Sequence, residues 1–360
     1  MRAASSVLAC AALLLTQGAG FADNRTLTDQ NGRNLSVPEK VDRIASLVIP
    51  GASMVLTLDR GSDRLVGIHP TVRDDIKHGL LADLFPAIRD VPANMAGDGF
   101  APNTEALLNA RPDLVLQWGD KGENIIRPIE TMGLTVLTLK YGQTDYVATW
   151  LRLIGQASGR AERAEALASW IERERDALRA QFAALPENER PRVLYLYRYH
   201  GGLQVAGAGT NMDFDIQLAG GVNVAAKTRG NAAVSREQII AWNPDVILLS
   251  NFDAQLTPDD LRKDPILSAT RAVRDNRLYK LPRGVFRWDP PSQETPLAWR
   301  WLAGMLHPRL YPLNGFRAQL RDTYTELYGQ PASEADIDRI LHVALNASSS
   351  GYAALQGAAQ

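Results

Sequence analysis

Two short runs in the second half of the chain concentrate arginines and aromatic side chains. The first run follows the apolar segment at 192–197, and the second run follows the apolar segment at 277–281. A guanidinium group donates paired hydrogen bonds to carboxylate, catecholate or oxyanion groups, and aromatic rings can flank a bulky ligand. We predict that six residues in these runs contact a ligand: Arg198, Tyr199, His200, Arg283, Arg287 and Trp288.

Simpler interpretations of these runs stay open. Tyr195 and Tyr197 alternate along an expected strand, so at least one of them should belong to the core. Arg287 could equally be an ion-pair partner on the surface.

The first half of the chain carries counterparts of these residues, at or shortly after the ends of expected strands at 65–68, 114–117 and 135–139. The carboxyl ends of parallel strands meet at one edge of a sheet, where α/β proteins bind ligands. We therefore predict four further ligand contacts: His69, Trp118, Lys121 and Tyr141.

Histidines are too few for a site that binds a bare metal ion. Such a site needs three or more converging His, Asp or Glu ligands. The chain has five histidines, and only His69 and His200 stand at expected strand ends. We predict no resident metal and no cofactor, although these two histidines could complete the coordination of a chelated iron.

The sequence motifs of common enzymes are absent. The chain contains no Gly-x-Ser-x-Gly, no His-Glu-x-x-His and no Gly-x-x-x-x-Gly-Lys-Ser/Thr. We predict a binding protein rather than an enzyme, and an exported hydrolase of unfamiliar type is the alternative from another class.

The elements that position these residues show an internal repeat. Residues 105–116 and 237–248 both fit the pattern E-x-(L/I)-(L/I)-x-x-(R/N)-P-D-(L/V)-(V/I)-L without a gap. Each copy predicts a short helix, a Pro-Asp stop and a buried strand. Since helices and strands alternate throughout, we predict an α/β fold with two similar lobes, each with a mainly parallel sheet, and a ligand cleft between them.

One long helix separates the two halves. Residues 160–185 contain no Gly or Pro, and their apolar residues recur at helical spacing before Pro186. We predict this helix as a stiff connection between the lobes. The expected divisions are a signal peptide at 1–22, a first lobe at 23–158, the connecting helix at 159–186, a second lobe at 187–310, C-terminal helices at 311–347 and a disordered tail at 348–360.

The N-terminus is typical of exported proteins. An apolar run from Val7 to Leu15 ends in small residues, and Gly20 and Ala22 suit a signal-peptidase site. We predict cleavage after Ala22 and a periplasmic protein. Cys10 allows an alternative in which the chain is a lipoprotein.

Composition limits the classes of partner. Charged residues make up 22% of the chain and the formal net charge is −1, so no basic excess predicts binding to nucleic acid. We expect a monomer that binds a small molecule.

The chain resembles the class III, helical-backbone periplasmic binding proteins. The resemblance covers roughly residues 43–310 and rests on the signal peptide, the long helix, the run Gly-Gly-Val-Asn-Val-Ala at 220–225 and the run Val-Ser-Arg-Glu-Gln at 234–238. The family delivers iron-siderophores, haem, corrinoids and, in some branches, oxyanions to ABC importers. The resemblance implies two Rossmann-like lobes joined by the long helix, and an iron(III) chelate, most simply a ferric siderophore, as ligand. The arginines expected in the cleft favour an anionic chelate, with an oxyanion such as molybdate, haem or a corrinoid as alternatives.

The resemblance also implies a docking partner. Family members meet arginines of a membrane permease dimer through a glutamate on each lobe, and the matching residues here are Glu105 and Glu237. Both stand in the first turn of an expected helix, where the helix dipole alone would favour an acid.

Overall fold

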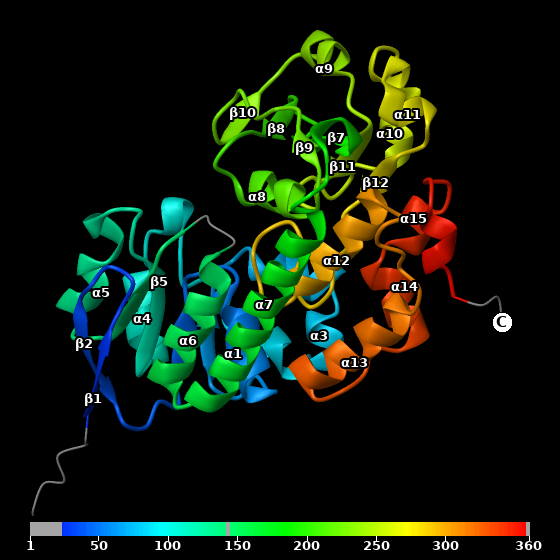
Figure 1. Ribbon diagram of the computed structural model, residues 1–360. Coiled ribbons are helices and arrows are strands. Elements are labelled where there is room, and N and C mark those ends of the chain that lie inside the picture. The colour runs from blue at the N-terminus through cyan, green and yellow to red at the C-terminus, as the bar shows by residue number, and fades with distance from the viewer. Residues whose placement is uncertain (1–23, 142–144, 358–360) are drawn as a thin grey trace, which may run out of the picture.

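The computed structural model describes residues 24–141 and 145–357. The predicted signal peptide and Cys10 lie outside these residues. Two β-sheets form separate α/β lobes, and the long helix α7 (Ala161–Phe182) lies between them in the chain (Figure 1). The predicted α/β fold with parallel sheets is confirmed.

The first lobe contains a four-stranded parallel sheet in the order β4-β3-β5-β6. Its strands are β3 (Ile44–Ser46), β4 (Leu65–Ile68), β5 (Leu114–Trp118) and β6 (Val136–Leu139). Its helices are α1 (Gly51–Asp59), α2 (Val72–His78), α3 (Leu81–Leu84), α4 (Thr104–Ala110), α5 (Arg127–Thr131) and α6 (Tyr146–Ser158). An antiparallel hairpin of β1 (Asn24–Thr28) and β2 (Asn34–Pro38) precedes them.

The second lobe contains a six-stranded mixed sheet in the order β10-β8-β7-β11-β12, with β9 also paired to β7. Its strands are β7 (Arg192–Arg198), β8 (Gln204–Ala206), β9 (Val222–Asn223), β10 (Asn231–Ala233), β11 (Val246–Leu249) and β12 (Leu278–Lys280). Strands β9, β7, β11 and β12 are parallel, whereas β8 is antiparallel to β7 and to β10. Its helices are α8 (Asn211–Leu218), α9 (Arg236–Trp242), α10 (Pro258–Lys263) and α11 (Arg271–Arg274).

The repeat predicted from the sequence is a repeat in three dimensions. Helices α4 and α9 both end at a residue in the left-handed conformation, Arg111 (φ 42°) and Asn243 (φ 40°). The aspartate that follows accepts a backbone N–H at the start of the lobe's first strand: Asp113 from Arg43 at 2.9 Å, and Asp245 from Arg192 at 2.9 Å. Each copy therefore joins a helix end to a strand start in the same way.

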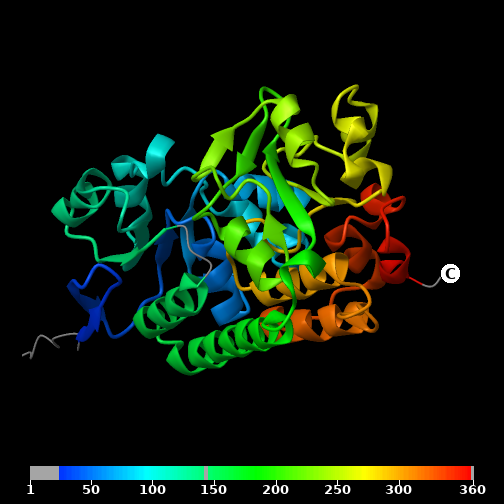
Figure 2. The same cartoon turned by 45° about the horizontal axis from the view of Figure 1, so that its top comes forward.

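Helix α7 packs along α6, and Figure 2 shows the two side by side. They approach closely because Gly155 has no side chain at the contact: a Cβ there would lie 2.2 Å from the Cβ of Ala164. The apolar face of α7 is buried through Leu167, Ile171 and Leu178. The helix predicted at 160–185 is thus present, and its last turn ends at Phe182.

The C-terminal helices share the core of the first lobe. Residues of α12 (Thr295–Leu306) and α13 (Phe316–Tyr328) belong to the same buried apolar cluster as the first sheet and one face of the second sheet, and α14 (Glu334–Ile340) and α15 (Val343–Asn346) follow them. A smaller cluster covers the other face of the second sheet. The segment 282–294 therefore connects the lobes a second time, and nearly all of it is buried.

The tail predicted as disordered is ordered from residue 348 to residue 357, so this prediction is wrong for these residues. Tyr352 and Leu355 are fully buried, and the Tyr352 hydroxyl lies 3.2 Å from the Trp301 indole nitrogen. The tail is rich in Ser, Gly and Ala, and this composition gave no indication that these two side chains would be buried.

Candidate functional site: a cleft between the lobes

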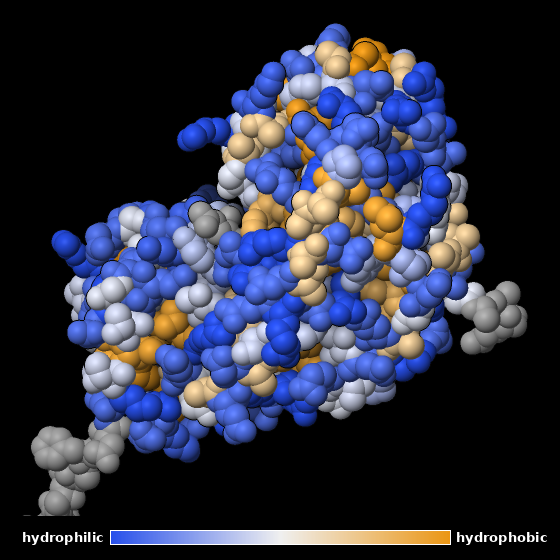
Figure 3. Space-filling view, viewed as in Figure 1, coloured by the Kyte–Doolittle hydropathy of each residue, from blue (hydrophilic) through white to orange (hydrophobic). Residues whose placement is uncertain are grey.

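A cleft of about 230 Å³ lies where the carboxyl ends of the two sheets face each other. In Figure 3 the surface is hollowed where the lobes meet, and much of the outer surface in this view is hydrophilic. Side chains of both lobes and of the segment 282–294 line the cleft. Its aromatic and charged lining residues are Trp118, Tyr141, Trp150, Tyr195, Tyr197, Phe252, Phe286, Arg287 and Asp289.

The first lobe contributes an aromatic wall. The Trp118 ring meets Tyr141 edge to face at 5.1 Å between centroids and Trp150 at 5.5 Å. Trp150 is fixed because its indole N–H donates to the Lys140 carbonyl at 3.0 Å. Tyr141 is 46% exposed, and the Lys121 amine lies 3.6 Å from its ring centroid. Burial, together with the nearby Tyr197 and Asp120, raises the pKa of Tyr141 above its ordinary value.

The second lobe contributes aromatic rings and charge. Tyr195 is buried in the core, as predicted for one member of the tyrosine pair, and its hydroxyl donates to Asp289 at 2.9 Å. Burial, with the Asp289 charge, raises the pKa of Tyr195 well above its ordinary value, so it stays a hydrogen-bond donor. Tyr197 packs against Phe252 at 5.3 Å.

Arg287 is both a cleft residue and an ion-pair partner, but the ion pair is buried rather than on the surface. The side chain is 3% exposed, and its Nε and Nη2 lie 3.2 and 3.1 Å from the two carboxylate oxygens of Asp75 on α2. Arg283 also pairs with Asp75, at 2.8 Å. These contacts cross from the second lobe to the first.

A buried acid holds the segment that carries Arg287 and Asp289. The Glu294 carboxylate accepts the Trp288 indole N–H at 2.6 Å and the Val285 backbone N–H at 3.0 Å, and the Tyr324 hydroxyl at 3.2 Å. Burial raises the pKa of Glu294 to about 7, although these hydrogen bonds oppose the shift. Trp288 and Glu294 thus fix the segment that carries Arg287 and Asp289.

Of the ten predicted ligand residues, Trp118, Tyr141 and Arg287 line the cleft, and their contact with a ligand stays a prediction. The other seven lie outside its lining: Arg198, Tyr199, His200, Arg283, Trp288, His69 and Lys121.

Three predicted residues at the end of β7, Arg198, Tyr199 and His200, turn away because the strand pairs with the antiparallel β8. Arg198 pairs in register with Gln204, which places 199–203 at the tip of a hairpin. There the Tyr199 hydroxyl donates to Asp264 at 2.9 Å, and the His200 Nδ1 lies 2.9 Å from Asp253. Arg198 itself donates to the Phe252 carbonyl at 2.7 Å.

His69 is also occupied elsewhere. It is 8% exposed, its Nδ1 accepts the Thr71 backbone N–H at 3.1 Å, and burial lowers its pKa to about 4. Its ring packs on Phe100 at 5.3 Å. His69 and His200 are therefore both engaged outside the cleft lining. Among the described residues, no group of three or more His, Cys, Asp or Glu side chains is placed to hold a metal ion.

Sequence reasoning missed Trp150, Phe252, Phe286 and Asp289. Asp289 and Phe286 lie in the run already singled out at 283–289, so that run was the available signal. Trp150 lies on α6, and Phe252 follows β11 by three residues. Nothing in their local sequence distinguishes them from core residues.

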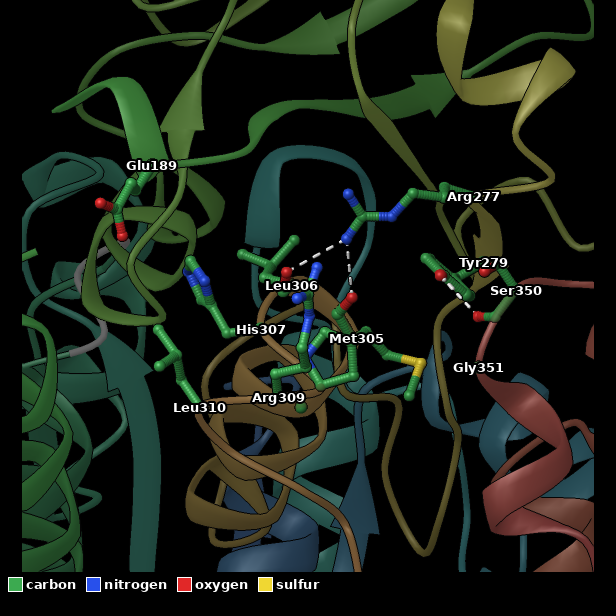
Figure 4. A pocket seen from close by; sticks show the side chains of 12 residues that line it. Glu189, Arg277, Tyr279, Met305, Leu306, His307, Arg309, Leu310, Ser350 and Gly351 are labelled. Atoms are coloured by element: carbon green, nitrogen blue, oxygen red, sulfur yellow. Dashed lines mark hydrogen bonds between the residues drawn. The ribbon is translucent and has the colours of Figure 1, made fainter. Parts of the chain in front are cut away.

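A larger hollow of about 560 Å³ lies away from this cleft, at the carboxyl end of α12 (Figure 4). One arginine that lines it, Arg277, donates from Nη2 to the carbonyls of Met305 and Leu306 at 2.9 and 3.1 Å. Arg277 thereby caps the helix end, and no predicted ligand residue lines this hollow. The interlobe cleft is the better candidate site.

The two predicted docking glutamates occupy equivalent places. Glu105 on α4 and Glu237 on α9 are both exposed, and each stands two residues after its helix N-cap, Asn103 or Ser235. Backbone and Ser235 hydrogen bonds lower the pKa of Glu237, so it is ionised at neutral pH. No helix within residues 24–141 and 145–357 is both long and apolar enough to cross a bilayer.

Comparisons with known proteins agree with a binding protein that has two α/β lobes. A family model described as periplasmic binding protein matches residues 63–284. The molybdate-binding protein of Haemophilus influenzae is 24% identical over 350 residues, 91% of this chain and 97% of the relative. A cobalamin-binding protein of Halobacterium salinarum is 26% identical over 257 residues, 66% of this chain and 67% of the relative.

A solved structure extends the agreement to the fold. The periplasmic solute binding protein of Veillonella parvula matches with a TM-score of 0.83 at 31% identity, covering 90% of this chain and 99% of that one. Because the family model spans more than half of the chain, this chain belongs to the periplasmic binding proteins, in the class III type that serves ABC transporters.

Proposed function

We propose that this protein captures a small metal complex, with a ferric siderophore as the first candidate, and delivers it to an ABC permease. The aromatic cleft between the lobes carries the proposal. Its rings can flank a chelate, and Arg287 can donate to an acceptor oxygen of the ligand. Export to the periplasm through the signal peptide at 1–22 belongs to the same proposal.

The size of the cleft favours a compact ligand. Its volume of about 230 Å³ lies below the roughly 300–1,000 Å³ of pockets that enclose drug-sized ligands. A ferric siderophore, haem or a corrinoid would each require the lobes to stand further apart than they do here. A molybdate-like oxyanion is the second candidate, favoured by the small cleft and by the similarity to a molybdate-binding protein along nearly the whole chain.

Tryptophan fluorescence tests the binding function, because Trp118 and Trp150 line the cleft. Titration with a ferric hydroxamate, a ferric catecholate, molybdate, haem and cobalamin should change the emission for at least one of them. Trp150→Phe should reduce the change, whereas Trp242→Phe on α9, outside the cleft lining, should preserve it. A protein that responds to none of the five and hydrolyses a generic ester or phosphate would contradict the proposal.

Docking is proposed through Glu105 and Glu237. Two equivalent acids on two lobes suit a partner that presents basic groups in two copies, such as a permease dimer. In cells, Glu105→Ala combined with Glu237→Ala should reduce uptake to background while the ligand Kd stays unchanged. The matched control is Glu162→Ala combined with Glu187→Ala, two other exposed acids, which should transport normally. A raised Kd in the first double variant would instead assign these acids to the fold or to the cleft.

A further inference from the structure

Four charged side chains join the lobes beside the cleft. Arg287 holds Asp75 through two hydrogen bonds and also lies 3.2 Å from Asp74, while Arg283 bonds both aspartates. Asp75 is fully buried, and the side chains of both arginines are 3% exposed. His78 lies 3.7 Å from Asp74 at the more exposed edge of the cluster.

The cluster cancels the charge that Arg287 would otherwise bring to the cleft. Two arginines face two aspartates, so their formal charges sum to zero. Arg287 is the only Lys or Arg among the described residues that line the cleft. Its Nε and Nη2 are occupied by the aspartates, whereas its Nη1 has no hydrogen-bond partner within the described part of the chain. Asp289 also lines the cleft, so the lining carries no net positive charge.

We propose that Asp75, supported by Asp74, determines the charge selectivity of the cleft and favours metal complexes of low net charge over polyanions. The inference rests on the proposed function and discriminates between its two candidates. A low-charge complex can accept a hydrogen bond from the free Nη1 while the ion pairs stay intact. A polyanion must compete with Asp75 for the guanidinium and lie near a buried carboxylate, which raises the free energy of that complex.

The test compares two ferric complexes of similar size: the neutral complex of a cyclic trihydroxamate and the trianionic complex of a tricatecholate. Molybdate serves as a small dianion. Wild-type protein should bind the neutral complex more tightly. Asp75→Asn keeps the shape of the side chain but removes its charge, and should shift the ratio of the two ferric Kd values toward the trianion by at least about tenfold. A general structural loss would weaken both complexes and leave this ratio unchanged.

The matched control is Asp83→Asn, which removes an exposed ion pair between Asp83 and Arg339 at 2.8 Å and should leave the ratio unchanged. If Asp75→Asn fails to fold, Asp74→Asn provides the test, because that side chain is 37% exposed; it should shift the ratio in the same direction. A wild-type preference for the trianion or molybdate, or an unchanged ratio in the variants, would overturn the inference. Binding of none of the probes would instead contradict the proposed function.

Discussion

The two walls of the cleft are built on two copies of the same structural repeat, but they present different kinds of side chain. The first lobe contributes Trp118, Tyr141 and Trp150, three aromatic rings without a formal charge. The second lobe contributes its own rings together with Arg287 and Asp289, which belong to the segment 282–294 rather than to the repeated unit. The repeat therefore builds the scaffold twice, while the charged part of the site comes from a connection between the lobes.

The largest effect we expect is a change of stability with pH. It concerns the charged wall of the cleft, whose segment is held in place by Glu294. The folded-state pKa of Glu294 is raised from the ordinary 4.5 to about 7, so the folded protein favours the protonated acid. This stabilisation is complete below pH 4.5 and is lost as pH rises through 7. Between these values the contribution of Glu294 to the free energy of unfolding should fall by about 3 kcal/mol.

Urea unfolding of wild type and Glu294→Gln between pH 4 and 8 measures this contribution. The amide mimics the protonated acid, so the variant should lack this part of the pH dependence. Parallel pH profiles for the two proteins would show that Glu294 does not titrate in this range.

The next largest effect is a loss of stability that tests whether the two copies of the repeat are structurally equivalent. Asp113→Ala leaves the backbone N–H groups of Asp42 and Arg43 without their acceptor, and Asp245→Ala does the same for Arg192. Each variant should lose about 2 kcal/mol of stability, because a hydrogen bond to a charged acceptor contributes roughly that much. Denaturant midpoints provide the measurement. A loss in only one variant would break the equivalence of the repeats, and Asp259→Ala, an exposed acid on α10, should change little.

The smallest effect compares one aromatic residue from each wall. Tyr141→Ala and Tyr197→Ala should each weaken binding of the best ferric ligand roughly fivefold, since one ring contact contributes about 1 kcal/mol. Calorimetric titration measures the Kd. Tyr199→Ala is the control, because the structure places this ring at the hairpin tip, and its Kd should match wild type. A strong loss with Tyr199→Ala would restore the sequence prediction that Tyr199 contacts the ligand.

The fold was largely accessible from local patterns. Residue spacing and turn residues, which act within a few positions, predicted several elements. These are the strands at 65–68 and 192–197, the helix before Pro186 and the repeat with its Pro-Asp stops. The prediction failed where burial depends on distant partners. Tyr352 is fully buried against Tyr279 and Trp301, residues 73 and 51 positions earlier in the sequence, and no local pattern reports that contact.

The candidate site, like the fold, was predicted where local sequence is sufficient and missed where distant partners decide. Strand ends directed attention to Trp118 and Tyr141, which line the cleft, because the ends of parallel strands share an edge by topology. The run 283–289 indicated a charged site, but its local sequence could not assign a partner to each side chain. Arg283 binds the aspartates, Trp288 binds Glu294, and Arg287 alone of these three reaches the cleft.

By itself, the sequence determined the class of the fold, the duplicated scaffold and the edges of the sheets at which a ligand site could form. Only the tertiary structure decided which side chains face the cleft and what charge they present. The physical reason is that spacing along the chain fixes local geometry, whereas the charge of Arg287 is cancelled by Asp75, which lies 212 residues away in the sequence and directly beside it in the fold.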